Sequence, residues 1–470
     1  MNINVISNRV FRSFLRNGGI YLGVLIFYIL VMSVFIFTFT SKADSLKDMI
    51  LGGRNVSGLL GALSIGATWI WAPALFVSSE NAYSLGMAGF FWFFVPNILT
   101  LLMFIPFAKR LNQELGDNFT LPSWMGERHQ SERVKRLYNL QMSVVSILST
   151  GVQIIAGAGI LAELTGLPYH WLTVVIGLVA LAYSQWSGIK ASIMSDAFNM
   201  VVMLVVSIGV VWGLGETLGW QTIGNGFGGI TGLNGSILDR DVFLTFGLSS
   251  TIGLLSGTFG DQNFWQLAGS IKSGRIGKAF GLGALFFAIV PLMLGLVGFM
   301  AAGVGFEPNV VGRVNLEFIQ AYLPSWVVTP FLFMIVGGLM STVDSNASSI
   351  AGLASDVIPN YTVGKSRWAM GVLVIGAIAV ANSGVTVPQL FLIYGTIRAT
   401  TMLPTVMTFM LDGVREKGVF YGIIGSMITG VPTFIYGSIN GDWRFKVAGS
   451  LLALLVSGSV VLINGKTREV

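Results

Sequence analysis

Apolar runs of about 20 residues, each ended by a short polar or charged loop, recur along the whole chain. A helical run of this length crosses the ~30 Å hydrocarbon core of a bilayer. The pattern therefore predicts an all-α, polytopic membrane protein with about thirteen transmembrane helices. The expected spans are 19–40, 56–79, 85–108, 136–164, 168–187, 191–214, 242–264, 276–304, 327–357, 366–384, 387–411, 416–437 and 445–464.

Composition agrees with this reading and excludes several functions. The chain is 53% hydrophobic and only 10% charged, whereas about a quarter of a soluble domain is charged. It has no cysteine and two histidines, His129 and His170, which argues against thiol chemistry, a His-built metal centre and an enzyme. The net charge of +6 is spread over short loops, so it does not indicate nucleic-acid binding. No obligate protein partner is evident, and the lipid bilayer is the expected surrounding.

The basic residues decide the expected orientation, because cytoplasmic loops are enriched in Lys and Arg. With the N-terminus outside, nineteen Lys and Arg fall on the cytoplasmic side and four fall in external loops. The tail residues Arg9, Arg12 and Arg16 point the other way. We expect a multi-pass protein of the plasma (inner) membrane, with the N-terminus outside and the C-terminus in the cytoplasm.

Two expected spans are interrupted by glycine, proline and polar residues. Two broken helices five spans apart are typical of inverted-repeat transporters, which bind their solute near the membrane midplane. We therefore expect four segments: a tail and accessory helix (1–50), a first five-helix repeat (51–215), a second with an external loop (216–411), and two accessory helices (412–470). The interruptions are Gly66, Pro73 and Ser78–Asn81 in the second span, and Gly247, Ser249, Ser250, Gly253, Ser256 and Gly257 in the seventh.

The ninth span carries hydroxyls and an acid inside an apolar run. Polar side chains at this depth are costly unless something binds them. Gly338, Ser341 and Thr342 share one helical face, and Asp344 and Ser345 repeat the same spacing from Ser341. Neutral oxygens beside glycine suit a hard monovalent ion such as Na⁺. The alternative is that both hydroxyls bond back to carbonyls of the preceding turn.

Three segments, LGGRNVSG…GATWIWAPALFVSSENAYSLG, GIKASIMSDAFNM and GGLMSTVDSNASSIAGLASDVI, resemble the sodium/solute symporter family, over nearly the whole chain. Within it, TWIWAPALFVSSENAYSLGMAGFFW and Asp261-Gln-Asn-Phe-Trp265-Gln266 are similar to the urea active transporters. One departure is Leu267, which stands where an Arg is common. The resemblance implies a leucine-transporter-type fold of 5+5 inverted repeats.

The resemblance also implies where a coupling Na⁺ binds. It places the backbone of Ala67 and Ile70 opposite the Gly338 carbonyl and the hydroxyls of Ser341 and Thr342. It further places Asp196 near the ninth span, as part of a second ion site. Asp344 would otherwise carry a coupling proton or only bond to a neighbouring helix. The members of the second ion site are Asp196, Ser341, Asp344 and Ser345.

The solute pocket is expected beside the breaks, with aromatic walls and a few polar groups. Trp is also common at membrane interfaces, so each Trp has an alternative role as an anchor. No Arg or Lys is expected in this pocket, since Arg398 is distant in the chain, and this argues against a carboxylate solute. Glu80 could attract a cationic amine. The expected solute contacts are Trp69, Trp71, Ala72, Pro73, Ala74, Glu80, Trp92, Ser249 and Gln262.

These features together favour a secondary active symporter. It would couple inward Na⁺ flow to uptake of a small polar solute, urea or a urea-like compound, by alternating access. The alternatives are an H⁺-coupled symporter of the same fold, a symporter of polyamines or amino acids, and a passive solute channel.

Overall fold

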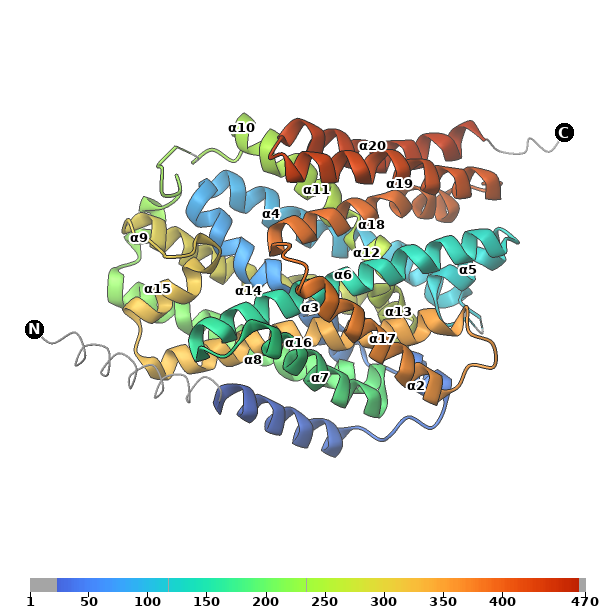
Figure 1. Cartoon of the computed structure of the whole chain (residues 1–470), viewed down its shortest axis with the longest axis horizontal. Coiled ribbons are helices and arrows are strands. Elements are labelled where there is room, and N and C mark those ends of the chain that lie inside the picture. The colour runs from blue at the N-terminus through green and yellow to red at the C-terminus, as the bar shows by residue number, and fades with distance from the viewer. Residues whose placement is uncertain (1–22, 117, 234, 465–470) are drawn as a thin grey trace, which may run out of the picture.

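The computed structural model describes residues 23–116, 118–233 and 235–464, which form a bundle of long helices lying along a common direction (Figure 1). The basic tail residues Arg9, Arg12, Arg16, Lys466 and Arg468 lie outside the described residues. One end of the bundle carries α5, and the other end carries α9 and α15. The chain ends of the described part lie on opposite flanks of the bundle.

The regular secondary structure of the described residues is helical, and their one β-bridge is an isolated pair, Val56 and Ile271. The expectation of an all-α protein is therefore confirmed. The helices that follow the first, Gly23–Phe39, are α2 Leu46–Leu51, α3 Gly58–Trp69, α4 Ala72–Glu114, α5 Leu121–Arg128, α6 Glu132–Thr165, α7 Tyr169–Ser187, α8 Ile189–Leu218, α9 Gln221–Asn225, α10 Arg240–Val242, α11 Leu248–Leu255, α12 Gly257–Gly260, α13 Gln262–Ser270, α14 Ile276–Gly303, α15 Val314–Tyr322, α16 Ser325–Ser355, α17 Val363–Ala381, α18 Val387–Met410, α19 Glu416–Ile439 and α20 Trp443–Ile463.

Nine helices in the described part of the chain are long and apolar enough to cross a membrane, and two shorter apolar ones, Gly23–Phe39 and α3, accompany them. Helix length alone therefore does not establish the expected thirteen spans, and that number stays a prediction. The 43-residue helix α4 turns at Gly86, where φ is 57° and ψ is −150°. Only glycine adopts this backbone readily. The turn separates the second expected span from the third.

The second expected span breaks between α3 and α4. Helix α3 begins after Ser57, whose side chain accepts from Leu60 N–H, and it ends at Trp69. Ile70 and Trp71 then leave the helical conformation, and Pro73 stands in the first turn of α4. A proline there is favourable, because that N–H has no helical partner anyway. Pro73 thus restarts a helix after the break, whereas we expected it to interrupt one.

The seventh expected span, 242–264, is also broken. It consists of α10, a π-helical turn at Phe243–Gly247, α11, α12 and α13. The chain leaves the helical conformation at Asp261, with φ −113° and ψ 122°. The two broken segments lie against each other, since a Cβ added at Gly257 would be 2.2 Å from the Trp69 ring. Val56 N–H also donates to the Ser270 carbonyl at 3.1 Å.

Three packing relations position the site. Helix α14 packs along α3 and α4, α16 packs against α6 and α8, and α18 packs against α11 and α12. Helices α19 and α20 form a pair at one edge of the bundle, next to α18 (Figure 1). The two broken segments therefore lie inside the bundle, enclosed by long helices on several sides.

Candidate functional site

The break between α3 and α4 meets α16 at Gly338. A Cβ added at Gly338 would be 3.0 Å from Leu75 Cδ1 and 3.7 Å from Ile70 Cγ2. Ser341 and Thr342 follow one turn later on α16, and both are buried. The structure thus brings α16 and the Ala67–Ile70 turn together, as the expected Na⁺ ligands require.

The hydroxyls of Ser341 and Thr342 do not bond back to their own helix. Ser341 Oγ donates to Asp196 Oδ1, while Thr342 Oγ1 is buried without any hydrogen-bond partner. The alternative in which both hydroxyls serve the preceding turn is therefore wrong. Because Ser341 donates its one hydroxyl proton to Asp196, its lone pairs remain available to a cation. An unpartnered buried hydroxyl is costly, and a hard cation would be a fitting partner.

Asp196 lies inside α8, which begins at Ile189, and it is fully buried. Asp196 therefore lies about two turns inside the helix and not at its N-terminus. Asp196 Oδ2 accepts from Ser64 Oγ at 2.6 Å and from Thr68 Oγ1 at 3.2 Å, in addition to its bond from Ser341. In the part of the chain that the structure describes, no Lys or Arg forms a salt bridge with Asp196. A buried carboxylate in this setting calls for a proton or a bound cation.

Asp344 belongs to the same polar cluster. Ser195 Oγ donates to Asp344 Oδ2 at 2.6 Å, and Ser192 Oγ donates to Asp344 Oδ1 at 3.2 Å. Ser345 completes the link, because its Oγ lies 3.1 Å from both Ser192 Oγ and Thr68 Oγ1. The structure therefore joins Asp196, Ser341, Asp344 and Ser345 in one hydrogen-bonded cluster. It spans α3, α8 and α16.

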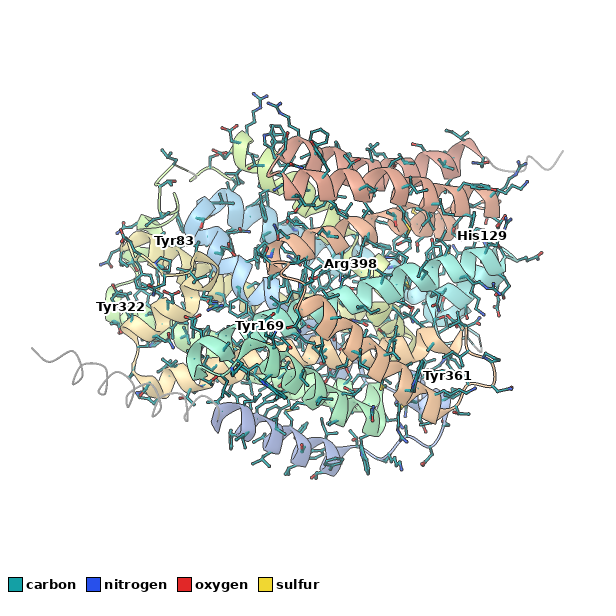
Figure 2. The ribbon with its side chains drawn as sticks, in the orientation of Figure 1. Tyr83, His129, Tyr169, Tyr322, Tyr361 and Arg398 are labelled. Carbon is teal, nitrogen blue, oxygen red and sulfur yellow. The ribbon has the colours of Figure 1, made fainter. Side chains whose placement is uncertain are left out.

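The aromatic residues at the break surround an arginine. Figure 2 shows Arg398 near the middle of the bundle, with His129 toward one end and Tyr83 toward the other. The Arg398 guanidinium carbon lies 5.6 Å from the Trp71 ring centroid and 4.4 Å from that of Tyr394. Arg398 also forms a buried salt bridge with Asp261. The expectation that no Arg or Lys lies near this pocket is therefore wrong.

The first residues of α4 hold the break in place. Ala72 N–H donates to Gln153 Oε1 of α6 at 2.8 Å, and the Ala74 carbonyl accepts from Ser78 Oγ at 2.7 Å. Since the backbone at a break lacks helical partners, Gln153 supplies an acceptor that the helix itself cannot. Pro73 is buried beside them.

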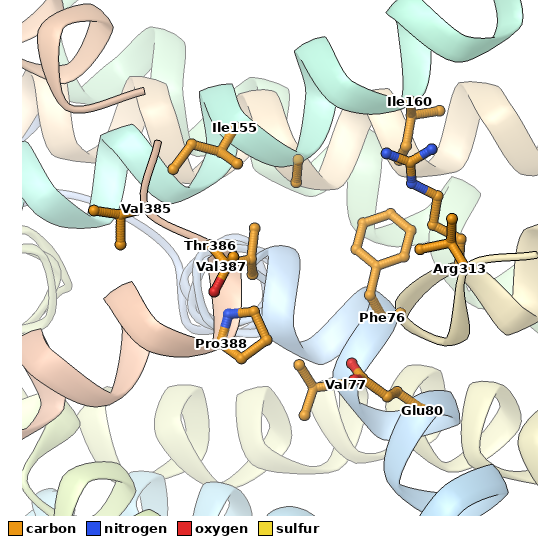
Figure 3. A pocket seen from close by; sticks show the side chains of 13 residues that line it. Phe76, Val77, Glu80, Ile155, Ile160, Arg313, Val385, Thr386, Val387 and Pro388 are labelled. Atoms are coloured by element: carbon orange, nitrogen blue, oxygen red, sulfur yellow. The ribbon is translucent and has the colours of Figure 1, made fainter. Parts of the chain in front are cut away.

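Glu80 lines a separate cavity, about two helical turns beyond the break. This cavity has a volume of about 350 Å³ and is lined by Phe76, Val77 and Glu80 of α4, together with Arg313 and Pro388 (Figure 3). Arg313 forms an ion pair with Glu163. Burial lowers the pKa of the Arg313 guanidinium from its usual value. The cavity therefore carries charges of both signs on mostly apolar walls.

The remaining expected solute contacts have separate surroundings. Trp92 Nε1 donates to the Ile237 carbonyl at 3.0 Å, and its ring packs on Phe243. Gln262 Oε1 accepts from Leu121 N–H at 3.2 Å, at the start of α5. Ser249 is buried on α11, and its hydroxyl has no partner. Trp92 and Gln262 thus contact other parts of the bundle, while Ser249 keeps an unused hydroxyl.

Sequence reasoning missed several residues of these clusters. Arg398 had the clearest signal, because an ionisable residue inside a span is a functional candidate by default. Asp261 was noted only as part of a motif. The hydroxyls Ser64, Thr68, Ser192 and Ser195 and the amide Gln153 had no distinguishing signal, because Ser, Thr and Gln occur throughout the apolar runs.

Comparison with known proteins agrees with this architecture. The model of the family described as "Sodium:solute symporter family" matches residues 49–426. The chain belongs to the sodium:solute symporter family. It is 21% identical over 472 residues to the "Urea-proton symporter DUR3" of Oryza sativa subsp. japonica, covering 87% of this chain and 64% of that protein. It is 26% identical to a "Sodium/proline symporter" of Staphylococcus aureus, covering 63% of this chain and 56% of that protein.

Solved structures of transporters share the fold. A Na⁺-coupled sialic acid symporter in a substrate-bound, outward-open state aligns with a TM-score of 0.74 at 14% identity, covering 96% of this chain and 99% of that one. MhsT in complex with L-phenylalanine aligns with a TM-score of 0.58 at 13% identity, covering 86% and 97%. The leucine-transporter-type fold is thereby confirmed.

Family membership and the apolar helices make this chain a multi-pass membrane protein of a transporter family. The relatives and the structural neighbours are transporters, in agreement with the expectation that the chain is not an enzyme. The chain spans about three fifths of the length of the curated relatives that it matches, 64% and 56%.

Proposed function

We propose that this chain is a secondary active symporter that couples inward Na⁺ movement to uptake of a small polar solute. One observation carries the proposal: the buried, unpartnered hydroxyl of Thr342 lies on the face of α16 that meets the Ala67–Ile70 turn at the end of α3. The five proposed ligands are all neutral oxygens, which suits a hard cation. The names of a sodium/proline symporter among the relatives and of a Na⁺-coupled symporter among the structural neighbours support Na⁺ as the ion.

The solute that we propose is urea or a urea-like compound. Support comes from the aromatic walls of Trp69 and Trp71 and from the arginine beside them, whose charge is balanced by Asp261. Such a site has hydrogen-bonding groups without a net charge, and this favours an uncharged solute. The rice relative is named as a urea symporter, and other relatives are named as proline symporters.

In alternating access, binding and release of the cation would connect and disconnect two helices. Bound between the Ala67–Ile70 turn and the Ser341–Thr342 pair, Na⁺ would join α3 to α16 and favour one state of the transporter. By linkage, solute that binds to this state then binds more tightly. We infer that residues 51–215 and 216–411 are the two repeats, flanked by the accessory segments 1–50 and 412–470.

Uptake into proteoliposomes tests the coupling. Radiolabelled urea is supplied outside with an inward Na⁺ gradient, or with K⁺ replacing Na⁺ on both sides at the same membrane potential. We expect accumulation above equilibrium only with the Na⁺ gradient, and its loss in Thr342→Val. Thr329→Val is the matched control, because Thr329 lies on the same helix near its other end and bonds only to Ser325. Equal uptake with Na⁺ and K⁺ would show that Na⁺ does not drive transport.

Proton coupling is the second candidate, and Asp196 favours it. Its partners are hydroxyls, so a proton would neutralise it as well as Na⁺ would. The name of the rice relative also includes a proton. A pH gradient imposed without Na⁺ distinguishes the two ions. Accumulation under the pH gradient, abolished by Asp196→Asn and kept by Thr342→Val, would establish H⁺ coupling in place of Na⁺ coupling.

A further inference from the structure

A buried salt bridge lies directly beside the break, and the proposed ion coupling makes no use of it. Arg398 and Asp261 are 2% and 3% exposed, and an ion pair so deeply buried is rarely a device for stability alone. Arg398 comes from α18 and Asp261 from the second break, between α12 and α13. The pair therefore connects a long helix to the broken segment that stands next to Trp69 and Trp71.

Glycines allow the segments that carry Arg398 and Asp261 to pack closely. A Cβ added at Gly260 would be 2.6 Å from Arg398 Cβ, and one added at Gly253 would be 3.3 Å from Gly395 Cα. Any larger residue at Gly260 would push α12 away from α18. Above the pair, the Trp71 ring packs edge-on against Phe391, with ring centroids 5.7 Å apart. The result is a tight, aromatic-walled chamber.

Several hydrogen-bonding atoms in or next to this chamber lack a partner. Trp71 Nε1 and Arg398 Nε are donors without an acceptor, and Asp261 Oδ1 is an acceptor without a donor. Ser250 Oγ, also without a partner, lines the same small cavity as Trp71 and Arg398. The cavity volume is about 10 Å³, room for about one water molecule. A single water could bond to all four of these atoms. A solute that replaces this water must offer the same set of acceptors and donors, and it requires the helices around the cavity to move apart.

We infer that the Arg398–Asp261 pair recognises the solute, and that the solute class is a small uncharged amide. An amide carbonyl accepts from Arg398 Nε and Trp71 Nε1, while its N–H groups donate to Asp261 Oδ1 and Ser250. The pair is internally neutral. A carboxylate would compete with Asp261 for Arg398 and leave a buried acid unpaired, and a cation would do the reverse. The inference rests on the proposed function, since it describes the solute site of that symporter.

Two pairs of isosteric solutes test this charge rule. Urea and guanidinium have the same shape and differ in charge, as do acetamide and acetate. Competition against radiolabelled urea is measured on the purified full chain at constant Na⁺, with millimolar acetamide, guanidinium chloride or sodium acetate as the competitor. In the wild type we expect urea and acetamide to bind about tenfold or more tightly than their charged isosteres. A wild type that prefers either charged solute, or binds neither amide, would overturn the inference.

Variants assign the effect to the two residues. Asp261→Asn leaves the arginine charge alone and should shift preference toward acetate, while Arg398→Gln should shift it toward guanidinium. Since removing one partner of a buried pair can prevent folding, the double variant Arg398→Gln, Asp261→Asn is decisive. It should keep the preference for uncharged solutes and lose about tenfold or more in urea affinity. Unchanged urea affinity in the double variant would refute the role of the pair.

Sodium binding without solute separates this inference from the proposed function. The melting temperature of the double variant should rise with NaCl relative to KCl as that of the wild type does, because Thr342 and Ser341 are untouched. If that rise is absent in the wild type, the Na⁺ proposal fails. If it is present while urea binding ignores Arg398 and Asp261, only the assignment of the pair fails.

Discussion

Thr342→Val isolates the proposed cation ligand, because valine has a similar shape and lacks only the hydroxyl. In the absence of Na⁺ the change removes a buried oxygen that bonds to nothing. The variant should therefore keep its stability or gain up to about 1 kcal/mol. A variant that loses a structural hydrogen bond behaves in the opposite way, so the sign of this effect is informative.

With Na⁺ present the same change removes one of the proposed ligands. A hydrogen-bonding or ligand interaction with a charged group contributes about 1.5–3 kcal/mol, so Na⁺ affinity should fall about 10- to 100-fold. At a Na⁺ concentration about 100 times the wild-type Kd, Na⁺ adds about 2.7 kcal/mol to the stability of the wild type. The variant should gain only about 0.4–1.4 kcal/mol at the same concentration.

Thermal unfolding during NaCl titration at constant ionic strength, with KCl as the balancing salt, measures both effects. Thr329→Val serves as the control on the same helix and should follow the wild-type curve. Two results would refute the reasoning. One is an unshifted Na⁺ titration in Thr342→Val, and the other is a loss of about 2 kcal/mol or more without Na⁺, which would reveal a structural partner for the hydroxyl.

Three further predictions address other parts of the structure. Asp196→Asn should abolish binding of the second cation or proton, seen as one fewer coupling charge per solute in current measurements on proteoliposomes; an unchanged charge ratio contradicts it. Gln153→Leu should destabilise the chain by about 1–3 kcal/mol, because Ala72 N–H loses its acceptor, whereas Gln153→Glu should keep that bond in thermal unfolding. Burial lowers the pKa of His129 to about 4, so the unfolded chain binds the proton more tightly than the folded chain. Stability should therefore rise between about pH 4 and 6.5, by up to about 1.4 kcal/mol per pH unit before allowance for partial exposure, and His129→Gln should flatten this slope.

The long apolar helices were predictable, because hydrophobic length reports directly on the bilayer. The Ser341–Thr342 pair was also predictable, since hydroxyls inside an apolar run are conspicuous and their helical spacing determines which ones share a face. The sequence predicted the break near Trp71 but not its form. Pro73 was expected to interrupt a helix, and the backbone geometry shows that Pro73 lies in the first turn of the next helix. The turn at Gly86 falls where the sequence predicted one span to end and the next to begin.

Contacts between segments that are distant in the chain could not be predicted from the sequence. Arg398 and Asp261 are 137 residues apart, and a single chain does not indicate which acid an intramembrane arginine meets. The family resemblance predicted that Asp196 lies near α16. It did not predict that the hydroxyls of Ser64 and Thr68, on α3 before the break, bond to Asp196. Such clusters depend on how helices rotate about their axes, which many weak packing contacts decide together.

Ser341 links the two proposed ion sites, and this gives the coupling a physical basis. Its hydroxyl donates its proton to Asp196 and keeps lone pairs with which it could bind a cation. A cation beside Thr342 would polarise Ser341 and strengthen its bond to Asp196, which favours the ionised form of that acid. An ionised Asp196 in turn attracts a second cation among Thr68, Ser345 and Asp344. Since linkage is reciprocal, occupancy of either site should raise affinity at the other, and Ser341→Ala should remove this cooperativity while leaving Thr342 in place.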